Sequence, residues 1–140
     1  MSSDTIYTAV HDYLSLQWTS TPIAWENEAF TPPIANDGSP MPFLIVEIEG
    51  TGYDQMSIGS GGSATELWRE SGTVFGHVLV PAGTGSTVAR QLATAFITLL
   101  RGLRLPPNVR FQSMSIGAGQ TGSENGALWG MTAWADWIRD

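Results

Sequence analysis

The chain has 140 residues, the size of a single domain, and 42% of them are apolar, which is enough for one buried core. It contains thirteen acids, six Arg and no Lys, giving a formal net charge of -7. Since non-specific DNA binding needs Lys and Arg against phosphate, this balance argues against a nucleic-acid-binding protein. The absence of Cys excludes disulfides, thiolate zinc sites and cysteine nucleophiles.

The sequence predicts a soluble protein that is made in the cytoplasm. Met1–Thr8 have neither the basic nor the apolar region of a signal peptide, and no segment reaches the ~18 consecutive apolar residues of a membrane span. Charged residues make up only 14% of the chain, against about 25% in ordinary soluble domains. A surface so poor in charge is typical of a protein that is covered by other proteins.

Two helices are predicted from apolar residues at helical spacing. The first follows an N-cap at Ser2 or Ser3, and its apolar face is formed by Ile6, Val10, Tyr13 and Leu14. The second covers about Ser86–Arg101 and has the clearest pattern in the sequence, a stripe formed by Val88, Leu92, Ala95, Phe96, Leu99 and Leu100. Gly102 is expected as the residue after its C-cap, and Pro106-Pro107 prevents its continuation.

The strands are predicted from alternation between turn residues. Phe43–Glu49 alternates regularly, and a weaker strand is expected at Gln55–Ile58. As one strand, Glu66–Val80 would span about 50 Å, so Gly72 and Gly76 are expected to be bends or bulges. The other predicted strands are Ile23–Trp25, Val109–Ile116 and Ala127–Ile138.

This order predicts one α+β domain over residues 1–140, with a mainly antiparallel sheet packed with two helices. The last two strands would form a long hairpin around the glycine-rich segment 117–126. A second glycine-rich segment, 59–65, also reads as a loop. The glycines expected to form interaction loops are Gly59, Gly61, Gly62, Gly117, Gly119 and Gly122.

The motifs that could carry chemistry have the wrong surroundings. Gly59–Ala64 matches a loose dinucleotide-binding pattern but precedes a strand instead of a helix. Gly83–Thr87 opens a helix, as a phosphate-binding loop does, but the required Lys is missing. His11 and His77 lie on different elements and are too few for a metal site. The sequence therefore predicts no cofactor, no metal and no enzymatic activity.

Two pairs of acids, Glu26/Glu28 and Glu47/Glu49, have the spacing that places both side chains on one face of a strand. Paired carboxylates catalyse glycoside hydrolysis, which makes a hydrolase an alternative function. Such an enzyme needs a deep cleft, and a domain of this size uses most of its apolar residues merely to fold. A solvated strand face is the favoured interpretation.

Six Trp in 140 residues is a high number. On the last predicted strand, Trp129 and Trp137 share one face, while Trp134 lies on the other. A strand that is apolar on both faces is either central in the core or covered by another subunit, because aromatic residues are enriched in interface cores. The core is the default interpretation, and the interface candidates are Trp68, Trp129 and Trp137.

Five segments occur in a characteristic order along nearly the whole chain, from about residue 5 to 138. They are Pro22–Asn27, Phe30–Pro33, Pro42–Ile48, Gly59–Gly62 and Gly72–Gly85. Together they resemble the tail terminator, or tail completion, proteins of siphophages and of phage-derived gene transfer agents. No catalytic motif contributes to the resemblance. The short first helix and the absence of Lys depart from typical members.

The resemblance implies a structural assembly protein with a small α+β sandwich fold. Members form a hexameric ring on the head-proximal end of the tail tube, which stops tube polymerisation and joins the tail to the head. The partners expected are therefore further copies of the chain, the tail tube protein and a connector or stopper protein. The expected location is the virion neck, after assembly in the host cytoplasm.

A ring of this kind would surround the DNA passing through it, without binding it specifically. An acidic lumen would repel the duplex and let it slide, and the candidate lumen acids are Glu47, Glu49 and Asp54. The alternative is that the acids keep the protein soluble. Two other functions stay open: another ring-forming neck or tail-tube component of the same particle, and a small-molecule binding module that uses the glycine-rich loops.

Overall fold

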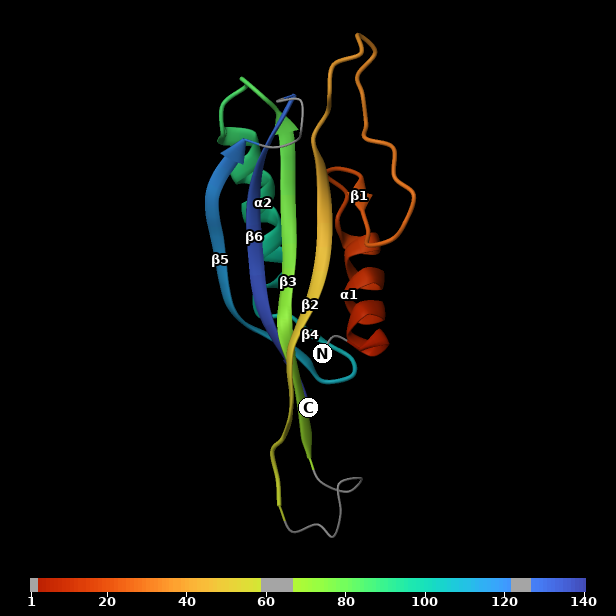
Figure 1. Ribbon diagram of the computed structural model, residues 1–140, viewed down its shortest axis with the longest axis vertical. Helices are drawn as coiled ribbons and strands as arrows, with labels where there is room; N and C mark the ends of the chain where they lie inside the picture. The colour runs from red at the N-terminus through yellow and green to blue at the C-terminus, as the bar shows by residue number, and fades with distance from the viewer. Residues whose placement is uncertain (1–2, 59–66, 122–126) are drawn as a thin grey trace.

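The computed structural model describes residues 3–58, 67–121 and 127–140. Within these residues, two helices lie on one side of a six-stranded sheet (Figure 1). The helices are α1 (Asp4–Gln17) and α2 (Thr87–Leu100). The strands are β1 (Ile23–Ala24), β2 (Phe43–Gln55), β3 (Trp68–Pro81), β4 (Arg104–Leu105), β5 (Val109–Thr121) and β6 (Leu128–Arg139). The predicted α+β class is confirmed.

The sheet has the strand order β1-β2-β3-β6-β5-β4. All neighbouring strands are antiparallel except β1 and β2, which are parallel. The two central strands pair without interruption, Glu70–Pro81 against Leu128–Arg139. The predicted hairpin of β5 and β6 is present, with two register shifts.

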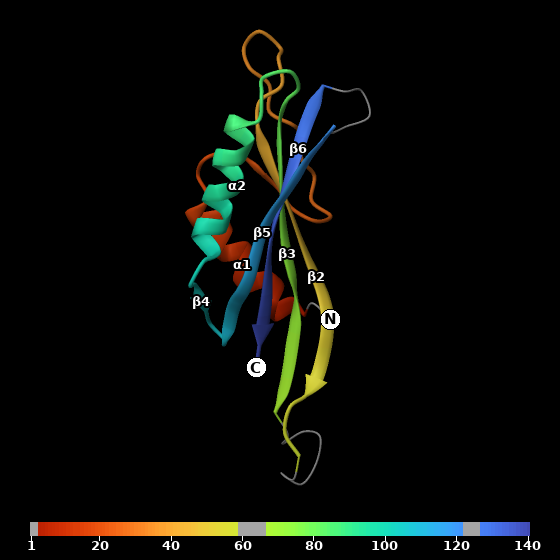
Figure 2. The same cartoon turned by 90° about the vertical axis from the view of Figure 1, so that its left-hand side faces the viewer.

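The face of the sheet toward the helices forms the core, and Figure 2 shows both helices on this side. Along much of β2, β3 and β6, every second residue is buried and most of these are apolar, as expected for a sheet covered on one face. From α1 the core contains Ile6, Val10 and Leu14, as predicted. From the strands it contains Leu44, Val46, Ile48, Val74, Val78, Val80, Val109, Phe111, Met131, Ala133, Ala135 and Trp137.

The bends or bulges predicted at Gly72 and Gly76 are not found in β3. Both glycines lie within its continuous pairing with β6, and both allow close packing. A Cβ at Gly72 would lie 1.9 Å from the backbone oxygen of Glu49, and one at Gly76 would lie 2.8 Å from the Phe96 ring. These positions therefore require glycine because neighbouring atoms occupy the space of a side chain.

The irregularity of the β2–β3 pair lies in β2 instead. The weaker strand expected at Gln55–Ile58 is wrong, because β2 continues to Gln55 and residues 56–58 are not in a strand. Between Gly50 and Gly52 the register with β3 shifts by one residue. This bulge lets a long strand follow the twist of the sheet without ending.

The buried face of α2 is rotated from the predicted stripe. Its fully buried residues are Ala89, Ala93, Phe96 and Leu100, whereas Val88 is 46% exposed. Small Ala residues face the sheet because the helix packs closely on it at Gly76. The predicted end of the helix is confirmed, since Gly102 follows the C-cap with a φ of +72°.

Two glycines expected in a loop belong to a strand. β5 extends to Thr121, so Gly117 and Gly119 lie within it. A Cβ at Gly119 would lie 1.8 Å from the ring of Trp129, and one at Gly117 would lie 3.0 Å from that of Trp134. Each indole thus packs across a glycine of the neighbouring strand, which explains why the segment is rich in glycine without being a turn.

Phe96→Ala is expected to lower the free energy of unfolding by about 3–5 kcal/mol, because it leaves a cavity between α2 and the sheet. Val88→Ala, on the exposed side of the same helix, should change it by less than about 0.5 kcal/mol. Urea unfolding of the two variants measures the difference. Equal effects would show that α2 does not pack through Phe96.

Candidate functional site

The second face of the sheet is not covered by either helix in the described part of the chain (Figure 2). Its centre is polar. His77 Nε2 lies 2.6 Å from Glu47 Oε1, and His77 Nδ1 lies 2.8 Å from the Thr132 hydroxyl. Because a carboxylate only accepts hydrogen bonds, the ring donates from Nε2 to Glu47, and Nδ1 shares a hydrogen bond with the Thr132 hydroxyl. This chain of contacts joins β2, β3 and β6.

The three candidate lumen acids all lie on this uncovered side. Glu47 and Glu49 are exposed and occupy outward positions opposite Phe75 and Thr73. Asp54 is also exposed, and its partner in the register is Arg69. The bulge at Gly50–Gly52 places Asp54 on the same face as Glu47 and Glu49. Without this shift of one residue, even-numbered and odd-numbered positions of β2 would lie on opposite faces of the sheet.

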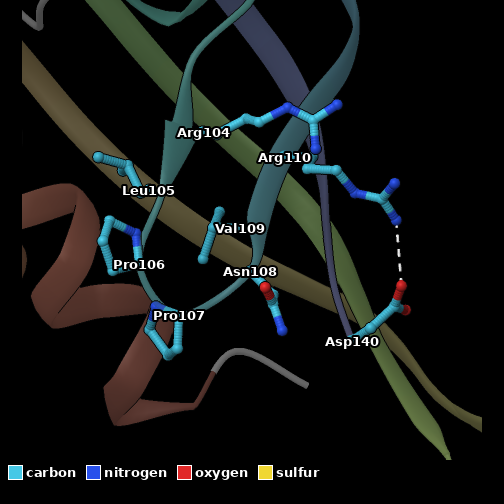
Figure 3. A pocket seen from close by; sticks show the side chains of 8 residues that line it. All are labelled: Arg104, Leu105, Pro106, Pro107, Asn108, Val109, Arg110 and Asp140. Carbon is cyan, nitrogen blue, oxygen red and sulfur yellow. Dashed lines mark hydrogen bonds and ion pairs between the residues drawn. The ribbon is translucent and has the colours of Figure 1, made fainter.

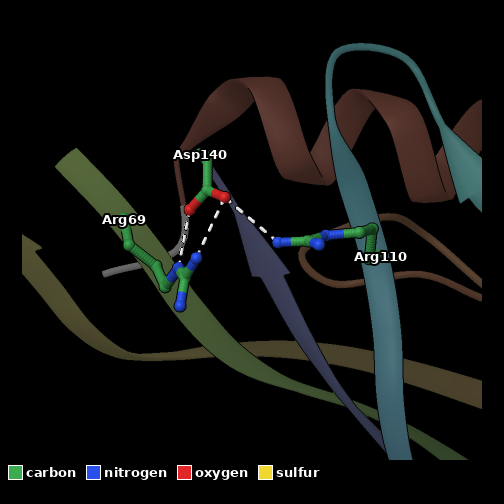
Figure 4. Close-up of polar contacts among 3 residues, drawn as sticks. All are labelled: Arg69, Arg110 and Asp140. Carbon is green, nitrogen blue, oxygen red and sulfur yellow. Dashed lines mark hydrogen bonds and ion pairs between the residues drawn. The ribbon is translucent and has the colours of Figure 1, made fainter. Parts of the chain in front are cut away.

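A cluster around Asp140 ties the ends of three strands together (Figure 4). Arg69 donates from Nε to Asp140 Oδ1 at 2.6 Å and from Nη2 to Oδ2 at 3.0 Å. Arg110 donates from Nη2 to the same Oδ2 at 3.0 Å. The hydrogen bonds from Arg69 lower the pKa of the Asp140 carboxyl, and this carboxylate raises the pKa of Arg69.

A second ionic contact attaches α1 to the sheet. Glu70 is 1% exposed on the core side of β3. It accepts hydrogen bonds from the backbone N–H of Ser3 at 2.6 Å and from the Ser3 hydroxyl at 2.9 Å, and Arg139 Nη1 lies 3.4 Å away. Ser3 is the N-cap of α1, so the carboxylate lies at the positive end of the helix dipole.

A surface pocket of about 560 Å³ lies beside the Asp140 cluster (Figure 3). Its floor is apolar, and Arg104 and Arg110 extend from neighbouring strands toward the same side. The lining residues are Arg104, Leu105, Pro106, Pro107, Asn108, Val109, Arg110 and Asp140. The carboxylate of Asp140 is held by the guanidinium groups of Arg69 and Arg110. The pocket is therefore suited to contact with an acidic partner, and this carboxylate is not a free base for catalysis.

The described residues contain no group of three or more His, Cys, Asp or Glu that could hold a metal ion. Among the same residues, neither helix has the length and apolar character needed to cross a membrane.

The predicted interface Trp residues lie in three different settings. Trp68 stacks on Tyr53, with ring centroids 5.4 Å apart, where the β2–β3 hairpin extends beyond the end of β6 (Figure 1). Trp129 is half-buried over Gly119. Trp137 is fully buried in the core, so its indole has no surface to offer a partner, and we do not propose it as an interface residue. The predicted loop residues Gly59, Gly61, Gly62 and Gly122 lie outside the described residues.

Sequence reasoning missed both ionic contacts. A signal for Glu70 was present, since alternation along β3 places it on the same face as Val74 and Val78, where an acid needs a partner. The Asp140 cluster had no such signal, because its three residues come from separate strands.

Comparison with known proteins gives the family. Residues 5–131 match a family model described as phage tail terminator protein. The chain belongs to the phage tail terminator family. One solved structure aligns with 100% of this tail terminator and 96% of its own chain, with a TM-score of 0.67 and 23% sequence identity. At that identity the likeness shows the fold alone. No curated protein matches the sequence.

Tail terminators are a structural protein family and not an enzyme family. Membership therefore assigns this chain a structural role in a phage tail, in the virion, with other tail or head components as its partners.

Asp140→Asn is expected to lower the free energy of unfolding of this tail terminator by about 1 kcal/mol at pH 7, since Arg69 holds both oxygens of a partly exposed carboxylate. The pKa of Asp140 is lowered by folding, so its contribution is complete above the unfolded value of about 3.9 and is lost as pH falls through the folded value. The wild type and the variant should therefore converge in acid.

Urea unfolding at pH 7 and at about pH 2.5 measures this convergence. Glu49→Gln is the control, because it removes an exposed carboxylate that forms no ion pair with any described residue. A difference between wild type and Asp140→Asn that is the same at both pH values would contradict the assignment.

Proposed function

We propose that six copies of the chain form a ring on the head-proximal end of the tail tube, where the ring stops tube polymerisation and joins the tail to the head connector. The family supports a role in the tail. The observation that carries the ring is the presence of two long strand edges on opposite sides of the sheet.

These edges belong to β2 and β5. In the described sheet, β1 pairs with β2 only at Leu44 and Ile45, and β4 pairs with β5 only at Val109 and Arg110. On the outer edge of β2, the backbone N–H of Ile48 also donates to Glu26 at 2.6 Å. The remaining length of the two outer edges carries backbone groups that a neighbouring chain could bind. The long strand predicted at Glu66–Val80 would also suit pairing with a neighbouring chain, but β3 offers no such edge, because it lies between β2 and β6.

Two different edges of one subunit make a heterologous contact, which closes into a ring when the rotation between copies is a simple fraction of a turn. The uncovered face of the sheet would then line the channel, since the helices occupy the other face. This orientation places Glu47, Glu49 and Asp54 toward passing DNA, which their charge repels. Screening over about 8 Å at physiological salt keeps that repulsion short-ranged.

Cryo-electron microscopy of the particle neck is expected to show one ring of this chain with sixfold symmetry and a mass of about 90 kDa, six times 15.0 kDa. Particles made without the chain should have tails of irregular length, because nothing stops the tube. A different symmetry, or tails of normal length without the chain, would refute the proposal.

Glu49→Lys combined with Asp54→Lys should leave tail length normal and slow DNA ejection, because Lys in the channel binds phosphate. Glu49→Gln combined with Asp54→Asn is the matched control, and it should slow ejection less, since it removes repulsion without adding attraction. Ejection kinetics are measured on particles whose structure shows both side chains in the channel. Normal ejection by the Lys variant would exclude an acidic sliding surface.

A further inference from the structure

Charge is segregated along the sequence. Residues 1–58 contain eight acids and neither Arg nor Lys, whereas residues 82–121 contain four Arg and no acid. The eight acids are Asp4, Asp12, Glu26, Glu28, Asp37, Glu47, Glu49 and Asp54, and all of them are exposed. The four Arg are Arg90, Arg101, Arg104 and Arg110.

The strand order places the strands that carry or adjoin these two sets at opposite edges of the sheet. In Figure 1, α1 and β1 lie beside β2 at one edge, and α2 lies beside β5 at the other. We call the first side the acidic flank (Asp4, Asp12, Glu26, Glu28 and Asp37) and the second the basic flank (Arg90, Arg101, Arg104 and Arg110). Three strand spacings separate β2 from β5, about 14 Å, which exceeds the Debye length of about 8 Å. Within the described residues, no ion pair joins the two flanks of one chain.

The acidic flank also lacks partners of opposite permanent charge within the described residues. The one ion-pair partner of Asp12 and Glu28 among the described residues is a histidine, His11, at 3.3 and 3.5 Å, and their side chains are 73% and 51% exposed. Like charges gathered on one surface repel each other, so this arrangement costs stability in the free chain.

The basic flank also has few partners of opposite charge within the described residues. Arg101 and Arg104 are exposed and form no ion pair with any described residue. Arg110 has an acidic partner, but Asp140 is already held by Arg69. Each flank thus presents charge that a partner of opposite sign would neutralise.

We propose that this partner is a second copy of the chain, with the basic flank of one subunit facing the acidic flank of the next around the ring. The inference rests on the proposed ring and adds the electrostatic attraction that orients the contacts between its subunits. Rotation about a ring axis brings opposite sides of neighbouring copies together, and these are the two sides that carry complementary charge. A two-fold dimer through either flank would bring like charges together, so the same pattern disfavours that competing assembly.

Complementary flanks act mainly on the rate and specificity of association. Neighbouring copies would be steered together at low salt, and the strand edges of β2 and β5 would then form the short-range contact. Assembly should therefore slow as salt rises toward 1 M, where the Debye length is about 3 Å.

Two charge-reversed variants test the proposal. Asp12→Lys, Glu28→Lys and Asp37→Lys together change the formal charge of the acidic flank from -5 to +1, so both flanks are basic. Arg90→Glu, Arg101→Glu and Arg104→Glu together change that of the basic flank from +4 to -2, so both flanks are acidic. All six side chains are exposed, so folding should be retained, and circular dichroism and thermal unfolding check that it is. Each variant is added to polymerising tail tubes of the same phage, and capped tube ends are counted by electron microscopy.

Each variant alone should cap at least about tenfold fewer tubes than the wild type, because every contact in its ring pairs like charges. An equimolar mixture should restore capping, since an even-numbered ring can alternate the two variants. Mass spectrometry of the restored rings should give three copies of each. The mixture is its own control, because it contains the same two proteins that fail separately.

Three results are distinguishable. If the wild type forms no ring on tubes, the proposed function fails and this inference fails with it. If the wild type forms rings and each variant alone does so equally well, the ring stands and the charged flanks do not hold it. If both folded variants fail and their mixture also fails, the flanks contact a different partner, such as the tube or the connector, and the proposal is overturned.

Discussion

The contact between Phe96 and the backbone of Gly76 sets the distance between α2 and the sheet. The ring of Phe96 occupies the space in which a side chain at position 76 would lie, and both residues are at the centre of the core. This approach requires small residues on the neighbouring helical turns, which is why Ala89 and Ala93 face the strands. With α2 so close, one helical layer is enough to cover the core face, and neither helix covers the other face of the sheet.

Glycine and tryptophan repeat this arrangement within the sheet itself. Trp137 packs against Gly72 on the core face, while Trp129 and Trp134 pack across Gly119 and Gly117. An indole that lies flat over a strand buries a large apolar area without adding thickness. With two helices in its described residues, the domain can therefore stabilise strands of up to fourteen residues.

Charged side chains have different roles in different parts of this tail terminator. Inside the chain, Glu70 attaches the start of α1 to β3, and Asp140 joins β3 to β5 through two arginines. These contacts fix the ends of long strands, where fraying would otherwise begin. Most of the remaining charged side chains are exposed on the uncovered face and on the two flanks. The arginines of this chain, which has no Lys, thus lie in ion pairs within the chain or on the basic flank.

The sequence by itself determined the elements whose pattern is local. Alternation located β2 and β3, helical spacing located α1 and α2, and the ordered segments indicated the family. The charge segregation between residues 1–58 and 82–121 could also have been read from the sequence. These features are accessible because each depends on residues within a few positions of one another, or on composition alone.

Only the tertiary structure decided which strands are central, why particular glycines are needed and which acids share a face. β3 is an interior strand because β6 pairs along it, although the paired residues are 47 to 69 positions apart in the chain (Pro81 with Leu128, Glu70 with Arg139). Gly76 is required by a ring on α2, and Asp54 joins Glu47 and Glu49 because a bulge shifts the register of β2. The physical reason is the same in each case: strand pairing and helix packing bring together residues whose separation in the sequence carries no periodic signal.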